Sequence, residues 1–179
     1  KYLEQHGVKV YPQTHVLDII TDKGTQKKFY LEHNLPTSSF ILMDTIDDII
    51  EGVQEGLIQY PFVQKLRREG YDGRGVQIIR NAQELTLLLQ GASIVENMVN
   101  IDKELGIIVA RNPSGELAIY DPVEMIFDAE ANLVDHLQAP ASISQEQSDY
   151  IKTIAKDLIC KMDMVGMLAI EWFLDREGN

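Results

Sequence analysis

Residues 65–75 constrain the fold most, because three glycines and four cations lie here between two short strand-forming runs. The runs are residues 61–64 and 76–79, so the segment predicts a hairpin with a long glycine-rich turn. Glycine adopts positive φ without strain and lets the backbone approach a ligand closely. The cations supply the charge that a polyphosphate requires. A loop that covers an anionic ligand is one interpretation, and a solvated surface hairpin without a ligand is the other.

Charge and composition narrow the class of protein. The 179 residues carry a formal net charge of -12, and 45% of them are hydrophobic, as in a globular chain. The acidic balance argues against nucleic acid, which requires a broad basic face, whereas a nucleotide needs only a local positive patch. No apolar run approaches the roughly 20 residues of a membrane span, and the first residues do not look like a signal peptide. We therefore expect a cytoplasmic protein without a membrane partner, whose one cysteine, Cys160, is buried in a helix.

Periodicity and end signals predict an α+β chain of short elements. Helices are expected from Asp22 to about His33, after Asp44 or Thr45, and after two capping boxes, Asn81-x-x-Glu84 and Ser144-x-x-Gln147. Strands are expected at residues 40–43, 61–64, 76–79, 93–99, 105–111, 116–120, 123–127 and 166–174.

The last residues indicate a chain that continues. The strand at 166–174 is too apolar to be exposed on both faces, and Asp175-Arg176-Glu177-Gly178 has the composition of a hairpin turn. A buried strand that lacks its hairpin partner indicates a cut inside a domain. We therefore expect a fragment of a longer protein.

Four features occur in the order found in the ATP-grasp superfamily, which the chain resembles. They are the strand lysine Lys65, the glycine loop 70–75, the strand 94–99 that leads to Glu104, and Glu171 in an apolar strand. The resemblance implies an α+β ATP-grasp fold, a small lid subdomain plus part of the larger antiparallel-sheet subdomain, truncated at both ends. Its expected parts are the end of an amino-terminal domain or linker (1–21), the lid subdomain (22–95) and an incomplete large subdomain (96–179).

Longer motifs resemble the 5-(carboxyamino)imidazole ribonucleotide synthase family within that superfamily. They are Gly70-Tyr71-Asp72-Gly73-Arg74-Gly75, residues 104–111, 139–144 and 165–173, with Asp22-Lys23, Gln26-Lys27 and Leu35-Pro36-Thr37. The resemblance implies ATP-dependent carboxylation of aminoimidazole ribonucleotide with bicarbonate in purine biosynthesis, with ATP and Mg²⁺ as cofactors and a homodimer as the full-length protein. The alternatives are another ATP-grasp carboxylase or ligase, and a non-catalytic nucleotide-binding module.

The same resemblance implies a role for each candidate residue. The expected ATP-phosphate contacts are Lys23, Lys65 and the lid residues Gly70, Tyr71, Asp72, Gly73, Arg74, Gly75 and Val76. The expected adenine-side connector is Glu96, Asn97, Met98 and Val99, with Glu104 on the ribose hydroxyls. Tyr71, Asp72 and Arg74 would also face the ribonucleotide, Asp72 and Arg74 as catalytic residues. Glu171 would bind Mg²⁺.

Each role has a structural alternative. The two lysines can be solvated cations, Glu104 an edge-strand charge, Tyr71 a packing residue and Asp72 a side chain that closes the turn. Strand alternation places Glu171 with Met167, Ala169 and Phe173, where an unpaired carboxylate is costly, so a metal or a cation is expected there.

The sequence also departs from the family pattern. Lys23 stands where arginine is usual, Glu69 where another glycine is common, and Phe127 where many members have a histidine. The family's second magnesium carboxylate is expected beyond Asn179. We therefore expect the isolated chain to be inactive.

Overall fold

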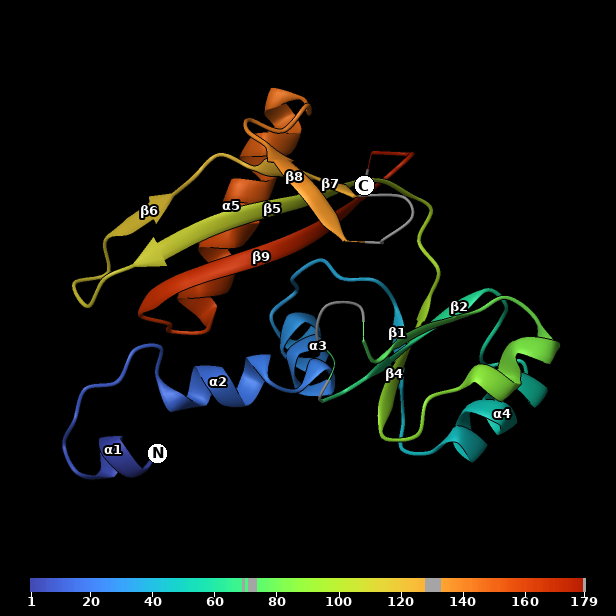
Figure 1. The fold of residues 1–179 in the computed structure, drawn as a ribbon. Helices are drawn as coiled ribbons and strands as arrows, with labels where there is room; N and C mark the ends of the chain where they lie inside the picture. The colour runs from blue at the N-terminus through green and yellow to red at the C-terminus, as the bar shows by residue number, and fades with distance from the viewer. Residues whose placement is uncertain (69, 71–73, 128–132, 179) are drawn as a thin grey trace. The chain divides into compact units, whose positions relative to one another are not determined.

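The computed structural model describes residues 1–179 except 69, 71–73, 128–132 and 179 (Figure 1). The chain forms two compact units. Unit 1 contains Lys1–Leu17 and Asn100–Asn179, and unit 2 contains Asp18–Val99. In the described part of the chain, every helix is too short or too polar to cross a membrane.

Unit 2 is built on a four-stranded antiparallel sheet. Its strands are β1 (Phe40–Met43), β2 (Phe62–Leu66), β3 (Val76–Ile79) and β4 (Ser93–Asn97), in the order β1-β4-β2-β3. Its helices are the end of α2 (Thr14–Ile20), α3 (Lys23–Glu32), α4 (Ile46–Gln54) and the 3-10 helix η1 (Ala82–Leu87). Strands β2 and β3 pair with Lys65 opposite Val76, so the hairpin predicted around the glycine-rich segment is confirmed.

The two faces of this sheet differ in chemistry. Phe62 and Val95 belong to an apolar core that also contains Ile49 of α4. Because strand residues alternate, Lys65 and Glu96 lie on the opposite face, where α3 contacts β4. One face therefore supplies the core, and the other is free to carry charged groups.

Capping side chains fix where the main helices begin. Asp22 caps α3, and Thr45 and Ser144 form capping boxes at α4 and at α5 (Gln145–Lys161). These side chains satisfy backbone N–H groups that the first turn of a helix leaves unpaired. The predicted starts of all three helices are confirmed, with Thr45 rather than Asp44 as the cap of α4.

Unit 1 is built on a five-stranded antiparallel sheet. Its strands are β5 (Ile101–Arg111), β6 (Leu117–Ile119), β7 (Val123–Phe127), β8 (Val134–Gln138) and β9 (Gly166–Asp175). Their order is β6-β5-β7-β8, and β9 pairs with β5. The unit also contains α1 (Tyr2–Gln5) and the start of α2. Figure 1 shows α5 crossing one face of β5 and β9.

Strands β5 and β9 separate a buried face from an exposed one. Leu105, Ile107 and Val109 are buried on the face that α5 covers. Glu104 lies on the other face, opposite Phe173 of β9. The alternation predicted for the strand at 166–174 is therefore present, and it positions the candidate carboxylates described below.

Two elements differ from the sequence prediction. Strand β8 was not predicted, because all its residues are exposed and it lacks an apolar stripe. The segment after Asn81 is a 3-10 helix. Asn81 does cap it, but the Glu84 carboxylate accepts a hydrogen bond from the Arg80 N–H instead of completing a capping box.

Cys160 is exposed, so the prediction of a buried cysteine was wrong. It lies four residues after Lys156 and seven after Thr153, which are also exposed, so it belongs to the solvent side of α5. The buried stripe of the helix contains its neighbours Leu158 and Ile159.

Candidate functional site

The face of the unit 2 sheet opposite the apolar core carries a buried carboxylate, Glu96. Its side chain is 5% exposed, and Lys65 Nζ lies 2.6 Å from Glu96 Oε2. Glu96 pairs with Val63 in the strand register, so Lys65 is its diagonal neighbour on the same face. The structure therefore brings together two of the predicted site residues from separate strands.

Lys27 on α3 is a second cation at Glu96. Its ammonium forms an ion pair with Glu96 Oε1 and donates hydrogen bonds to Thr37 Oγ1 at 2.6 Å and to Ser38 Oγ at 2.8 Å. The Ser38 hydroxyl in turn donates to Glu96 Oε1 at 3.0 Å. The ammonium also lies 5.6 Å from the centre of the Phe40 ring, within the range of a cation–π contact.

These contacts shift the pKa values of both groups. Burial acts to raise the pKa of Glu96, but Lys65 and Lys27 outweigh it and hold this pKa below the usual carboxyl range. Burial lowers the pKa of Lys27, against the opposing effect of Glu96. Among the described residues, the cluster thus combines one carboxylate with two lysines, and these three side chains together carry a net positive charge.

Sequence reasoning gave Lys27 no role, although a signal for it exists. Lys23 and Lys27 are four residues apart in a helix predicted to start at Asp22, and this spacing places both on one helix face. Lys23 is the predicted phosphate ligand. The same spacing places Lys27 next to it on that face.

The two ends of the glycine-rich segment meet at Gly70 and Gly75. A Cβ atom at Gly70 would lie 2.9 Å from the Arg74 carbonyl oxygen and 3.3 Å from Lys23 Nζ, and one at Gly75 would lie 3.0 Å from Gly70 Cα. Gly75 has φ of 77°, and its carbonyl accepts a hydrogen bond from the Leu66 N–H at 2.8 Å. Glycine is therefore required by close backbone approach, and Lys23 lies beside this junction.

Three residues of the predicted lid, Tyr71, Asp72 and Gly73, lie outside the described residues, as does Glu69 before the lid. Among its other members, Arg74 is exposed and Val76 begins β3. The roles assigned to Tyr71, Asp72 and Gly73 thus remain predictions.

The predicted adenine-side segment, Glu96–Val99, begins in β4 and leaves it after Asn97. The Asn97 amide donates to Ser39 Oγ at 3.2 Å, and the Met98 side chain is exposed. Residues 98–100 then connect β4 of unit 2 to β5 of unit 1. The segment is therefore the chain connection between the two units.

In unit 1, Glu104 and Glu171 lie on the sheet face that α5 does not cover. Glu104 is opposite Phe173, and Glu171 is opposite Gly106. The two carboxylates are therefore diagonal neighbours on adjacent antiparallel strands. Two predicted site residues that are distant in sequence share one face in this way.

The sequence analysis placed Glu171 where an unpaired carboxylate is costly, so that a metal or a cation would be needed. This prediction was wrong. Glu171 does share a face with Met167, Ala169 and Phe173, as predicted, but all four residues are exposed. A solvated carboxylate carries little desolvation cost, so it does not require a metal or a cation. Within the described ranges, no group of three or more His, Cys, Asp and Glu side chains gathers as a metal site.

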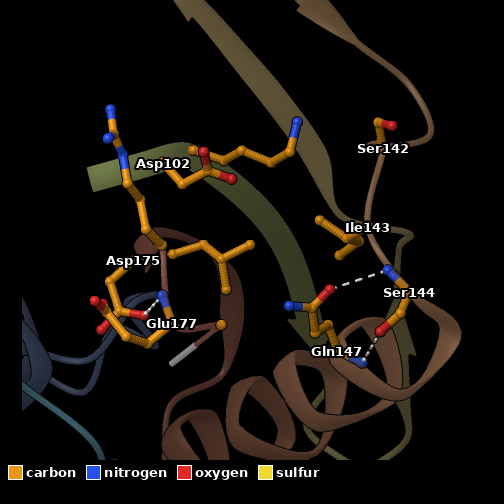
Figure 2. Close-up of a pocket in the computed structure, with 11 residues that line it drawn as sticks. Asp102, Ser142, Ile143, Ser144, Gln147, Asp175 and Glu177 are labelled. Atoms are coloured by element: carbon orange, nitrogen blue, oxygen red, sulfur yellow. Dashed lines mark hydrogen bonds between the residues drawn. The ribbon is translucent and has the colours of Figure 1, made fainter. Parts of the chain in front are cut away.

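A pocket of about 410 Å³ lies on the other side of the unit 1 sheet. Figure 2 shows Ser144 and Gln147 at its edge, joined by the two hydrogen bonds of the α5 capping box. Lys103 lines it and pairs with Glu124 at 2.7 Å. Because Lys103 and Glu104 are consecutive on β5, they project from opposite faces. The pocket is therefore separate from the face that carries Glu104 and Glu171.

The sheet of unit 1, the glycine-rich hairpin of unit 2 and the connection between them define an ATP-grasp domain. The family model described as the ATP-grasp domain matches residues 28–178, and the chain belongs to this family. The predicted α+β ATP-grasp fold is confirmed.

Within this family, the chain resembles N5-carboxyaminoimidazole ribonucleotide synthases. The protein of that name from Synechocystis sp. is 34% identical over 177 residues, which cover 96% of this chain and 43% of that protein. Its counterpart in Bacillus subtilis is 29% identical over 183 residues, covering 99% of this chain and 47% of that protein. The chain therefore spans about half the length of these relatives.

Solved structures of proteins with a closely similar name share the fold. The N5-carboxyaminoimidazole ribonucleotide synthetase from Thermotoga maritima has a TM-score of 0.85 and 34% identity, covering 100% of this chain and 45% of that one. An ADP complex of an N5-carboxyaminoimidazole ribonucleotide synthetase has a TM-score of 0.88 and 28% identity, covering 99% of this chain and 47% of that one. The resemblance inferred from the motifs is thus confirmed.

Proposed function

We propose that the protein containing this chain is an ATP-dependent ligase that carboxylates aminoimidazole ribonucleotide with bicarbonate, and that this chain supplies its ATP-binding part. The relatives that match nearly the whole chain carry the name of that enzyme. The observation that best supports this proposal is the position of Lys65. Its ammonium pairs with Glu96 in a cluster of one carboxylate and two lysines, which is positively charged although the whole chain has a formal net charge of -12. A polyphosphate ligand needs such a local positive patch.

The ATP phosphates would bind Lys23 and Lys65, with the segment Gly70–Val76 closing over them. Gly70 and Gly75 bring the two ends of this segment together, and Lys23 Nζ lies beside them. Backbone N–H groups in such turns form anion-binding concavities. The lid would therefore contribute backbone donors as well as the guanidinium of Arg74.

The adenine and ribose would bind farther along the chain. The Glu96 carboxylate is occupied by two lysines, so Glu96–Val99 would contact the adenine edge through backbone groups. Glu104 would accept hydrogen bonds from the ribose hydroxyls, since a carboxylate offers acceptors only.

Glu171 would hold Mg²⁺. Its carboxylate fits the ion because magnesium prefers oxygen ligands and usually takes few of them from protein, and Glu104 is its diagonal neighbour on an exposed face. When bound, the ion would offset charge on the phosphate oxygens.

The reaction would run in two transfers. Bicarbonate attacks the terminal phosphorus of ATP and releases ADP, and the resulting carboxyphosphate then donates its carboxyl group to the amine of aminoimidazole ribonucleotide as phosphate leaves. Tyr71, Asp72 and Arg74 would face the ribonucleotide, with Arg74 binding its phosphate. The protein contributes mainly by positioning the reactants and neutralising charge.

Calorimetric titration of the full-length protein with ADP tests this proposal. Lys65→Met should weaken ADP binding at least tenfold, because a phosphate ligand is lost. Lys28→Met removes an exposed lysine from α3 and should leave the affinity within about twofold, which controls for net charge. ATP hydrolysis should rise when aminoimidazole ribonucleotide and bicarbonate are added together.

Other outcomes would identify the alternatives. Unchanged ADP affinity in Lys65→Met would favour a structural or non-catalytic module. Hydrolysis stimulated by a different acceptor, and not by aminoimidazole ribonucleotide, would indicate another ATP-grasp carboxylase or ligase.

The organisation of the whole protein belongs to the same proposal. Residues 22–95 would be the lid subdomain, residues 96–179 part of the large subdomain, and the full-length protein a cytoplasmic homodimer. Light scattering after size-exclusion chromatography measures the oligomeric state, and a monomeric mass at micromolar concentration would contradict the dimer.

A further inference from the structure

The starting observation is that three donors converge on the Glu96 carboxylate from three segments. Lys27 of α3 and the Ser38 hydroxyl reach Oε1, and Lys65 of β2 reaches Oε2. A carboxylate that is 4% exposed needs at least one charged partner, because an unpaired charge is costly in a low-dielectric site.

The two lysines differ in how exposed their side chains are. A lysine ammonium has three N–H donors. Those of Lys27 are directed at Thr37 Oγ1, Ser38 Oγ and Glu96 Oε1, and its side chain is 12% exposed. The Lys65 side chain is 22% exposed. Lys27 is therefore committed to the protein, whereas Lys65 is the more accessible of the two.

We propose that Lys27 is a positioning residue for phosphate binding, which acts by keeping Glu96 satisfied so that Lys65 can turn to an anionic ligand. This inference rests on the proposed ATP site. When Lys65 moves toward a phosphate, Glu96 retains Lys27 and Ser38 on Oε1. Without Lys27, the same movement would leave the buried Glu96 carboxylate without a cation. Lys65 would therefore stay paired with Glu96.

The first test compares ADP with adenosine in the full-length protein, by calorimetry. Lys27→Met should weaken ADP binding at least tenfold and leave adenosine binding within about twofold, because only the phosphates depend on Lys65. Lys27→Gln, which can still hydrogen-bond Thr37 and Ser38, should show the same pattern, and it replaces Lys27→Met if that variant does not fold. The exposed Lys28→Met is the matched control. Equal losses for both ligands, or no loss for ADP, would overturn the proposal.

The second test removes the buried charge. In Lys27→Met/Glu96→Gln, Lys65 is no longer held by a carboxylate, so ADP affinity should return to within about threefold of the original. A structural role for Lys27 predicts the opposite, since a second substitution in the cluster should add to the damage. Failure of the double variant to recover would therefore contradict the proposal.

A third test needs no nucleotide and so separates this inference from the proposed function. Acetylation of Lys65 by a brief pulse of acetic anhydride, measured by mass spectrometry against Lys28, should slow at least threefold in Lys27→Met. It should accelerate in Glu96→Gln. If Lys65 labelling is insensitive to both changes, the proposal is wrong, even if ADP binds as expected.

Discussion

The Asp22 carboxylate caps helix α3 and also receives the guanidinium of Arg67, which donates from Nε and from one terminal nitrogen at 2.9 Å each. Arg68 Nε adds a third donor at 3.1 Å. Asp22 is 3% exposed, so these are protected, charge-assisted bonds. They tie the start of α3, which carries Lys23 and Lys27, to the end of β2, which carries Lys65.

Replacing Asp22 should therefore destabilise unit 2. We expect Asp22→Ala to lower the free energy of unfolding by about 3 kcal/mol, since it removes a cap and leaves Arg67 without its carboxylate. Asp22→Asn keeps a capping oxygen and should cost less. Urea unfolding followed by circular dichroism measures both. Equal stability of Asp22→Ala and the unmodified chain would show that this junction is not structural.

The same carboxylate predicts a dependence of stability on pH. Burial acts to raise the pKa of Asp22, but the hydrogen bonds from Arg67, the Thr25 N–H and Arg68 outweigh it and hold this pKa well below the usual range. Its folded pKa is thus below its unfolded value of about 4. The stabilisation is complete above that value and is lost as the pH falls below it.

We therefore expect the stability gap between the unmodified chain and Asp22→Asn to stay constant from pH 6 to about pH 5 and to shrink from there to pH 3. Urea unfolding at several pH values measures the gap. Glu96 and Glu124, whose pKa values are also lowered, remain in both proteins and contribute equally to their acid sensitivity. A gap that stays constant over this range would contradict the assignment.

Because Gly24 has no side chain, the Arg67 guanidinium can occupy the space beside it. A Cβ atom at Gly24 would lie 2.5 Å from Arg67 Nε. Helix propensity favours alanine over glycine by roughly 0.5–1 kcal/mol, but displacing Arg67 costs charge-assisted bonds worth about 1.5–3 kcal/mol. Gly24→Ala should therefore destabilise the chain by about 1 kcal/mol in urea unfolding. In an Arg67→Ala background the obstacle is gone, and Gly24→Ala should become neutral or stabilising.

The predicted elements of this fold came from local signals. The capping residues Asp22, Thr45 and Ser144 fix helix starts within a few residues, and the apolar run of β9 is long enough to stand out. Strand β8 has no such signal, because its side chains are exposed and its pairing with β7 depends on backbone hydrogen bonds. Exposed strands of this kind are specified by their neighbours and are missed by periodicity.

The sequence predicted which residues belong to the candidate site and their order along the chain, but not how they lie in space. Lys65, Glu96, Glu104 and Glu171 were selected through family resemblance, and the register explains why they form two pairs. The spacing to Lys23 places Lys27 on the same helix face, but its contact with Glu96 depends on how α3 lies on the sheet, which no local pattern specifies. The exposure of Glu171 likewise depends on α5 covering the opposite face. Tertiary packing therefore decides what the motifs leave open.

Gln64 is a buried polar side chain whose role is structural. It is fully buried, its amide nitrogen donates to the Leu89 carbonyl at 2.8 Å, and its amide oxygen accepts from the Leu89 N–H at 2.8 Å. It thereby satisfies both backbone groups of one residue. Gln64→Leu has similar volume but leaves both groups unpaired, so we expect a loss of about 2–4 kcal/mol in urea unfolding. A neutral effect would show that water replaces these bonds.

Exposure of Cys160 gives a prediction that needs no unfolding. The thiol lies on the solvent side of α5, so it should react with a chromogenic aromatic disulfide in the folded chain, releasing one equivalent of coloured thiolate per chain. Cys160→Ser should abolish the signal and change stability by less than about 0.5 kcal/mol, as is usual for exposed positions. A thiol that reacts only after denaturant is added would show instead that the position is buried. Cys160 would then belong to the buried apolar stripe of α5 that contains Leu158 and Ile159.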